Sequence, residues 1–245
     1  MATNVTYFFT PLVLLLIPED CHDEFFVKFN FFDVPCLKIA ISKGLGYAII
    51  LGAVVVKVPQ IMKMLKAKSG AGVSIASLFF EMTAITFTMA YSVHKNFPFS
   101  SWGETFFMCI QDIIITILTF IYGGSTLKAL LFAPIYIGIN YALCTPAITP
   151  FALIVKLQEF NLVVLLLSRF IQIWANFSNG HTGQLSVISQ SLIAFGSLAR
   201  VFTTIQETGD MLMTSQFILA CSLNCMILGQ IFWYWNVAPE KAKKE

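Results

Sequence analysis

The chain has 245 residues, of which 57% are hydrophobic and 11% charged, and its mean hydropathy is +0.78. Soluble domains carry roughly 25% charged residues, so this chain lacks the charge needed to coat a surface that faces water. The net charge of +2 is small and forms no long basic block, which argues against nucleic acid as a partner. The composition therefore predicts a membrane protein.

Seven apolar stretches are long enough to cross a bilayer, because a hydrocarbon core about 30 Å thick needs ~20 helical residues. They cover residues 44–64, 73–92, 102–122, 127–147, 161–175, 185–205 and 212–235. Lys156 and Glu159 interrupt the start of the fifth, so we expect a short interfacial helix over 151–159 and a span beginning near Phe160. The apolar run 5–17 is too short to span, and we expect it to lie on the membrane.

The distribution of lysine predicts the orientation, because cytosolic loops are enriched in Lys and Arg. Three lysines follow the first span and three lie in the tail, at positions 63, 66, 68, 241, 243 and 244. With seven spans, a cytosolic tail places the N-terminus in the lumen. The sequon at Asn4 would then be lumenal, and we expect the one at Asn176 in a cytosolic loop without a glycan. The tail lysines are similar to an endoplasmic-reticulum retrieval signal, a plain solvated tail being the alternative.

Two of the six cysteines, Cys21 and Cys36, precede the core of the first span. They could form a disulfide if they face an oxidising lumen, and the sequence leaves this open. The other four lie in apolar stretches, where cysteine behaves as a small hydrophobic residue.

The two halves of the chain match when one is shifted by 112 residues. Lys57 then falls on Arg169, Gln60 on Gln172 and Asp112 on Asn224, without a gap. The matched units are spans one to three and five to seven. Because span four inverts the chain once more, both units share one orientation, as in parallel repeats related by an axis along the membrane normal.

This repeat predicts an all-α fold of two three-helix bundles joined by a linker helix. The expected segments are a lumenal or interfacial N-terminus, a first bundle, a linker span, a second bundle and a cytosolic basic tail: residues 1–43, 44–122, 123–147, 148–235 and 236–245.

The clearest motif is Lys57-Val58-Pro59-Gln60 in the first span. Pro59 lacks an N–H and clashes with the preceding turn, so it kinks the helix and leaves a backbone acceptor unpaired. Gln60 places an amide that can donate and accept beside this break. The motif can serve as a hinge, or the amide can simply bond a neighbouring helix. Gln172 recurs in the second half, although Ile171 replaces the proline.

Four ionisable residues have similar depth in their spans, about 10–15 Å from the cytosolic ends: Lys57, Glu81, Asp112 and Arg169. Two readings are open. The four can form a neutral cluster that holds the bundles in register. Alternatively, Lys57 or Arg169 binds an anionic phosphate while Gln60 and Gln172 bind sugar hydroxyls. Ile193 occupies the repeat position of Glu81, so Arg169 has no acid from its own bundle.

Other polar candidates are Asn224, at the repeat position of Asp112, and a trio at the lumenal end of span six: Arg200, Gln206 and Glu207. The trio could form an entry for a headgroup or an ion pair at the rim. The sequence shows no metal triad and no nucleophile–base pair, so we expect neither an enzyme nor a cofactor or metal.

The Pro-Gln pair near the cytosolic end of a three-helix unit, repeated in seven spans, resembles the PQ-loop proteins, relatives of the SWEET sugar transporters and of cystinosin. Residues 96–104, 179–186, 197–200, 205–210 and 234–236 are similar to one branch, the mannose-phosphate-dolichol utilization defect proteins. The missing second proline departs from the family pattern and weakens the case for a symmetric two-hinge cycle.

This resemblance implies an endoplasmic-reticulum protein required for the use of dolichol-phosphate-mannose and dolichol-phosphate-glucose. The implied pathways are N-glycosylation, O- and C-mannosylation and GPI-anchor synthesis. The implied partners are dolichol-phosphate-linked sugars and glycosyltransferases. Three roles remain open: moving or presenting the lipid-linked sugar, assisting glycosyltransferases without transport, and carrying a small solute or sugar.

Overall fold

The computed structural model describes residues 13–14, 17–70, 73–182 and 187–235, which fold into helices and connecting turns. The predicted helix over 5–17 falls largely outside these residues, as do the sequon at Asn4 and the lysines of the tail. The elements in chain order are α2 (Glu19–His22), the π-helical turn η1 (Asp23–Val27), α3 (Val34–Val55), α4 (Val58–Ala67), α5 (Ile75–His94), the 3₁₀ turn η2 (Phe99–Ser101), α6 (Gly103–Tyr122), α7 (Thr126–Cys144), α8 (Phe151–Asn179), α9 (Val187–Glu207) and α10 (Met211–Trp233).

Six of the described spans are long and apolar enough to cross a membrane: α3 with α4, α5, α6, α7, α8 and α10. The protein is therefore an all-helical, multi-pass membrane protein, as predicted. α9 corresponds to the predicted sixth span and is 21 residues long, but it is not one of the six. The count of seven spans stays a prediction.

The first span begins ten residues earlier than predicted. α3 starts at Val34, and together α3 and α4 form a segment of 34 residues. The Asp33 carboxylate caps the helix by accepting a hydrogen bond of 3.0 Å from the Cys36 N–H, and Pro35 occupies the first turn, where its missing N–H costs nothing. The N-terminal segment predicted over 1–43 thus includes the first turns of this helix.

The fifth span is also longer than predicted. α8 is one continuous helix of 29 residues, so the separate interfacial helix over 151–159 is wrong. Lys156 and Glu159 are exposed on its surface and are good helix formers, so their charges do not break it. Asn176, which we expected in a loop, lies inside α8 and is buried.

Both halves have the same internal packing. In the first half α6 packs against both α3 and α5, and in the second half α10 packs against both α8 and α9. The contacts between the halves are reciprocal, because α3 packs on α9 while α5 packs on α8. This exchange of first and second helices is the pattern that a two-fold axis between parallel repeats produces. The linker α7 packs on α5 and α6 of the first half.

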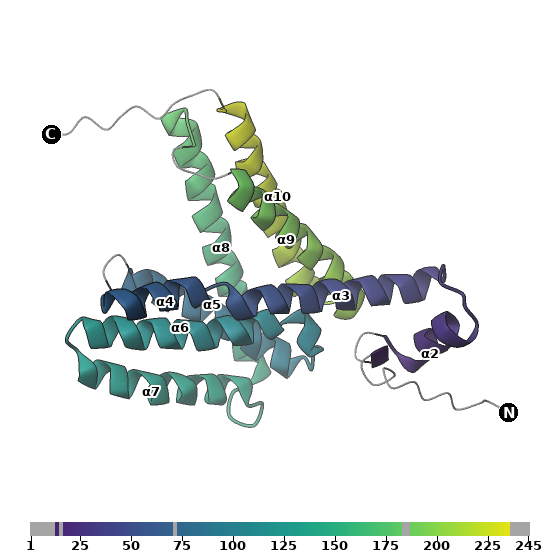
Figure 1. Ribbon diagram of the computed structural model, residues 1–245, viewed down its shortest axis with the longest axis horizontal. Helices are drawn as coiled ribbons and strands as arrows, with labels where there is room; N and C mark the ends of the chain where they lie inside the picture. Colours follow the sequence, from purple (N-terminus) through teal and green to yellow (C-terminus); the bar gives the residue numbers. More distant parts are fainter. Residues whose placement is uncertain (1–12, 15–16, 71–72, 183–186, 236–245) are drawn as a thin grey trace.

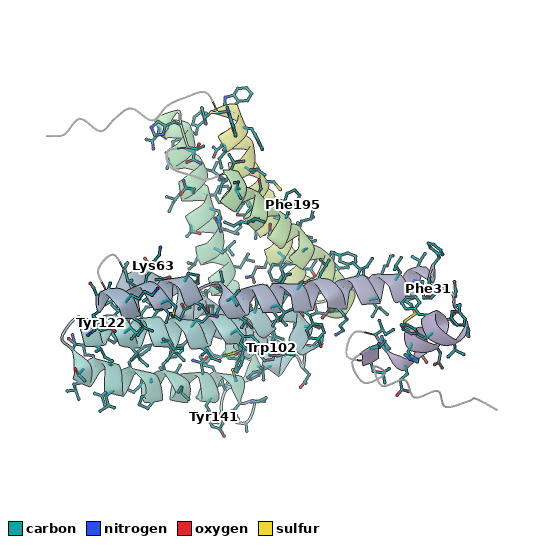
Figure 2. All side chains as sticks on the ribbon, in the orientation of Figure 1. Phe31, Lys63, Trp102, Tyr122, Tyr141 and Phe195 are labelled. Atoms are coloured by element: carbon teal, nitrogen blue, oxygen red, sulfur yellow. A yellow bond between two sulfur atoms is a disulfide. The ribbon has the colours of Figure 1, made fainter. Side chains whose placement is uncertain are left out.

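The two halves meet at one end and diverge toward the other (Figure 1). The start of α8 lies against the first half, whereas the end of α8, the start of α9 and the end of α10 project away from it. Much of the outer surface is apolar, as expected where lipid replaces water: Tyr141 on α7 and Phe195 on α9 both point outward and are exposed (Figure 2).

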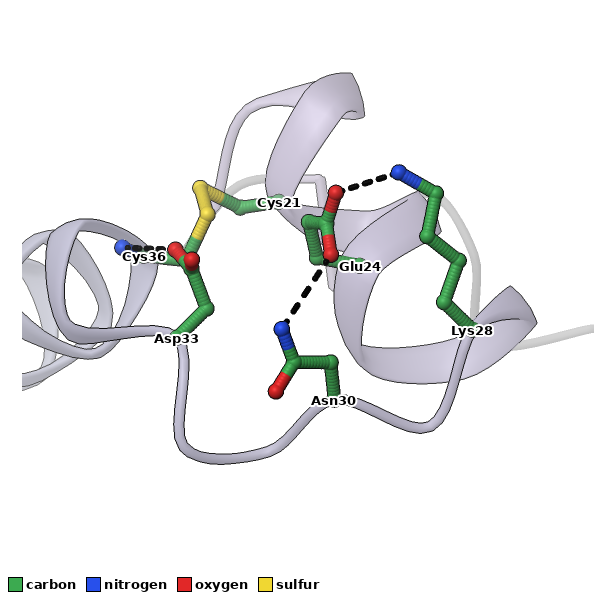
Figure 3. Close-up of a disulfide and its surroundings, with 6 residues drawn as sticks. All are labelled: Cys21, Glu24, Lys28, Asn30, Asp33 and Cys36. Carbon is green, nitrogen blue, oxygen red and sulfur yellow. Dashed lines mark hydrogen bonds and ion pairs between the residues drawn. A yellow bond between two sulfur atoms is a disulfide. The ribbon is translucent and has the colours of Figure 1, made fainter.

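A small N-terminal unit precedes α3. A disulfide joins Cys21 to Cys36 and so ties α2 to the first turn of α3 (Figure 3). Ile17 and Phe25 are buried beside the two cysteines. Between the two cysteines, Glu24 of η1 forms an ion pair with Lys28. The possible pairing of Cys21 with Cys36 is thus present in the structure.

Candidate functional site

The Lys57-Val58-Pro59-Gln60 motif interrupts the first span. α3 ends at Val55 and α4 begins at Val58, with Lys57 between them. Pro59 cannot donate to the carbonyl of Val55, so the helical ladder is broken at the place that the sequence predicts. Pro59 and Gln60 are both exposed, and among the described residues the Gln60 side chain makes no hydrogen bond.

Lys57 is neutralised by two carboxylates of its own half. Its Nζ lies 2.7 Å from Glu81 Oε1 on α5 and also pairs with Asp112 on α6. The Asp112 side chain is 0% exposed, and its second oxygen has no hydrogen-bond partner. A buried charge is costly unless it is paired, so this trio fixes the broken segment against α5 and α6. Three of the four predicted charges therefore come together.

Arg169 does not join them. It lies on α8 in the other half, and among the described residues its guanidinium makes neither an ion pair nor a hydrogen bond. Asn224 replaces the acid that Asp112 supplies in the first half, and its side-chain oxygen is buried without a partner. Of the two open interpretations, a single neutral cluster of all four charges does not form among the described residues, because Arg169 makes no ion pair with the other three. The phosphate-binding interpretation stays a prediction.

The second half carries a chain of amides instead. Gln172 donates to Asn176 at 2.9 Å, and Asn176 donates to Gln230 at 2.9 Å. Gln230 on α10 then donates to the backbone oxygen of Ile173, also at 2.9 Å. The repeat had identified Gln172, but Asn176 and Gln230 were missed. The i, i+4 spacing of Gln172 and Asn176 on one apolar helix was the available signal.

Two of the three residues predicted at the end of span six, Arg200 and Glu207, form ion pairs, which was one of the two open interpretations, but with residues of the first half. Arg200 is buried, pairs with Glu104 at the start of α6, and donates to the Ser101 backbone oxygen at 3.2 Å. Glu207 accepts from Ser42 at 3.2 Å and lies 3.6 Å from Lys43, both on α3. Gln206 is exposed.

These interactions connect α9 with α3 and α6, so they join one half to the other. Asp210, before α10, adds a third link. Its carboxylate lies 3.1 Å from Lys95 Nζ and accepts from the Tyr91 hydroxyl at 3.0 Å. We call the ends that carry Lys43, Glu104, Arg200, Glu207, Lys95 and Asp210 the joined ends. The opposite ends, with α4 in one half and the end of α8 in the other, are the free ends.

Asp210 lies in the turn between α9 and α10. Burial alone would raise the pKa of its carboxyl. The backbone N–H of Met213, Lys95 and the Tyr91 hydroxyl all stabilise the carboxylate, and together they lower the pKa below its usual value of 3.8. Asp210 is therefore ionised at neutral pH and holds the joined ends together.

Among the described residues, no group of three His, Cys, Asp or Glu side chains could hold a metal ion.

Comparison with known proteins finds a family match in the first half of the chain. The PQ loop repeat family matches residues 41–101, the part of the first half that contains the Pro59 break. The match covers one repeat in the first half of the chain, and it agrees with the resemblance to PQ-loop membrane proteins.

The chain is also 23% identical to Solute carrier family 66 member 3 of Homo sapiens over 182 residues, which cover 74% of this chain and 88% of that protein. It is thus related to the solute carrier 66 proteins. No solved structure matches the chain.

Proposed function

We propose that the protein binds dolichol-phosphate-linked sugars in the endoplasmic-reticulum membrane and moves them between the leaflets, supplying mannose and glucose donors for glycan and GPI-anchor synthesis. The observation that carries this proposal is the missing partner of Arg169. Its repeat counterpart Lys57 has two carboxylates, whereas no acid faces Arg169 among the described residues.

An unpaired cation inside a membrane span needs a reason, because insertion of a charge near the bilayer centre costs roughly 2.5–3.5 kcal/mol. A phosphate that enters with a lipid would remove this cost, and the planar guanidinium binds phosphate through two parallel hydrogen bonds. A neutral solute would leave Arg169 uncompensated. The charge therefore favours an anionic substrate over a free sugar.

The arrangement of the halves supports movement between leaflets. Buried ion pairs close the joined ends, while the free ends diverge (Figure 1). If the joined ends opened and the free ends closed, a bound headgroup would cross the membrane while its lipid tail stays in the bilayer. Lys63, Lys66 and Lys68 lie at the free ends, so we assign these ends to the cytosol and the N-terminus to the lumen. A disulfide at the joined ends agrees with an oxidising lumen.

Two other roles have some support. Relationship to Solute carrier family 66 member 3 favours transport of a small solute. The exposed apolar surface of α8 and α9 would suit an accessory role, in which the protein presents the donor to glycosyltransferases without moving it. The protein is not proposed to be an enzyme, since its described polar clusters serve as helix contacts and supply no nucleophile–base pair.

The test is transfer of dolichol-phosphate-mannose between leaflets of liposomes that contain the purified protein. We expect transfer above protein-free liposomes, and at least a tenfold loss in Arg169→Gln, since a charge-assisted hydrogen bond contributes about 1.5–3 kcal/mol. The matched control is Lys156→Gln, an exposed base on the same helix, which should transfer like wild type.

Two results would contradict the proposal. If folded wild-type protein transfers no lipid yet restores donor use in cells, the accessory role replaces transport. If the same liposomes take up free mannose or another small solute while the lipid stays in its leaflet, the small-solute role replaces it.

A further inference from the structure

The N-terminal unit displays aromatic side chains on its surface. Phe29, Phe31 and Phe32 are 71%, 52% and 88% exposed in the loop between η1 and α3, and we call residues 29–32 the aromatic loop. The Phe31 ring lies 6.3 Å from the buried Phe25 ring and 6.4 Å from the Phe29 ring, so these rings form one cluster. A contiguous apolar patch of this kind marks a surface that meets lipid or another protein.

The shape of the aromatic loop is fixed by the residues around it. The Asn30 N–H donates to the backbone oxygen of Glu24 at 2.8 Å, and the disulfide between Cys21 and Cys36 closes the unit on α3 (Figure 3). Phe29 has a φ of +54°, a left-handed conformation that bulky residues rarely adopt. Backbone strain of this kind is found at functional sites. The rings are therefore held outward by the fold of the loop.

The aromatic loop is continuous with the outer face of α3. Val34, Leu37 and Ile41 are spaced i, i+3 and i+7, so they lie on one face of the helix, and they are 58%, 39% and 47% exposed. Leu45 extends this face by one further turn and is also exposed. Farther along, α3 is part of a candidate membrane span, in which lipid replaces water around the outer face. One apolar surface thus runs from the aromatic loop into the span.

The length of the first span places the start of α3 at the membrane surface. α3 and α4 together have 34 residues, which make about 51 Å at a rise of about 1.5 Å per residue. The hydrocarbon core is about 30 Å thick, and the bilayer with its headgroups about 40–45 Å. A tilted segment of this length reaches from one headgroup layer to the other. Because the lysines of α4 occupy one layer, Val34 falls in the other, at the side of the joined ends.

We infer that the aromatic loop inserts into the headgroup boundary of the leaflet at the joined ends, with a lipid surface as its partner. The charges of the unit indicate which lipids it meets. Residues 17–33 contain five acids and one lysine, so anionic headgroups would repel the unit. Burial of the rings therefore drives insertion, into a leaflet of uncharged lipids such as phosphatidylcholine. This inference goes beyond the proposed function, since it holds for any substrate.

Three other partners could cover the same patch. They are the apolar run 5–12 of this chain, which lies outside the described residues, a second copy of the chain, and a different protein. The continuity with the outer face of α3 and the length of the first span favour lipid over all three. A photoreactive group in the loop distinguishes them, because it reacts with whatever lies against it.

The experiment replaces Phe32 by the photoreactive aromatic residue p-benzoylphenylalanine in the full-length protein. The protein is placed in phosphatidylcholine liposomes in which a small share of the lipid carries an alkyne tag. We expect illumination to attach at least about tenfold more tagged lipid at position 32 than at position 20, because burial of a Phe side chain favours insertion by more than that factor. Asp20 is the matched control, an exposed acid of the same unit. Phe80, 72% exposed on α5, is the positive control inside a span.

Each other outcome would overturn the inference. A crosslink from position 32 to residues 5–12 would show that the chain covers its own aromatic loop, and a crosslink to a second copy would show a dimer contact. Equal labelling of positions 20 and 32, while position 80 reacts with lipid, would place the loop in water. The same illumination in membranes of cells that express the protein tests the last alternative. A protein adduct in place of the lipid adduct there would make the loop a protein-binding surface.

Discussion

The side-chain amide of Gln111 takes the place of the helical hydrogen bond between Lys57 and Ala53. Its oxygen accepts from the Lys57 backbone N–H at 2.9 Å, and its nitrogen donates to the Ala53 backbone oxygen at 2.7 Å. In an unbroken helix these two backbone groups would bond each other. The break before Pro59 is therefore satisfied from α6, one residue before the acid that pairs with Lys57.

Replacing Gln111 by Leu should destabilise the protein markedly. The substitution leaves the Lys57 N–H and the Ala53 oxygen buried or in lipid without partners, and each such loss costs about 1–3 kcal/mol. We expect thermal unfolding in detergent to occur at a clearly lower temperature. Gln206→Leu is the control, since Gln206 is exposed, and it should unfold like wild type. Equal stability of both variants would show that the amide does not support the break.

Gly46 sets how closely α3 approaches η2. A Cβ at this position would lie 2.7 Å from the Ser100 backbone oxygen, whereas a Cβ at Gly52, on the same helix, meets nothing within 4 Å. Gly46→Ala should therefore separate α3 from η2 and cost about 1–3 kcal/mol of stability. Gly52→Ala should be neutral or stabilising by up to about 1 kcal/mol, because alanine favours a helix. The measurement is the unfolding temperature of both variants in one detergent. A Gly46→Ala variant more stable than the Gly52→Ala variant would contradict this packing.

Apolar length predicted the spans from sequence, and the 112-residue repeat predicted the two halves. Counting residues along each span placed Lys57, Glu81 and Asp112 at one depth, and the structure pairs these three, which are part of the four-charge cluster that was one of the two interpretations. The role of Gln111 could not be predicted, since it depends on which side of α6 faces the broken turn. The repeat also indicated that Arg169 lacks an acid from its own half, since Ile193 occupies the position of Glu81. Whether Arg169 reaches the acids of the first half could not be predicted, because depth along a helix does not tell how far apart two halves lie.

The pair of Arg200 and Glu104 is predicted to hold the joined ends. Removal of one member of a buried ion pair leaves the other uncompensated and costs about 3–5 kcal/mol. We expect this loss for Arg200→Met and for Glu104→Gln, measured by denaturant or thermal unfolding. The double variant Arg200→Met with Glu104→Met should regain much of the loss, because no charge remains buried. If the stability loss of the double variant equals the sum of the losses of the two single variants, the ion pair is not the relevant interaction.

The Asp210 carboxylate should make the joined ends sensitive to acid. Its pKa is lower in the folded protein than the ordinary 3.8, so its stabilising contribution is present above pH about 3.8 and is lost as the pH falls through the folded value. Asp210→Asn keeps a helix cap but removes the charge that faces Lys95, and should lose about 0.5–1 kcal/mol at neutral pH. The difference from wild type should disappear below the folded pKa. The exposed Asp20→Asn serves as the control, and a difference that persists in acid would contradict the role of the charge.

The disulfide between Cys21 and Cys36 should hold the N-terminal unit on α3. The two cysteines are 15 residues apart, and closing such a loop contributes about 3 kcal/mol in the chain-entropy estimate. In Cys21→Ser, hydrogen exchange over residues 19–33 should become much faster, while exchange in α6 and α10 stays as in wild type. Reduction of the wild-type protein should give the same result. Cys225→Ser is the control, because Cys225 is a free thiol on α10. If both N-terminal cysteines of protein taken from cells under non-reducing conditions react with a thiol reagent before reduction, the bond is absent in the cell. The proposed lumenal assignment of the joined ends then loses this support.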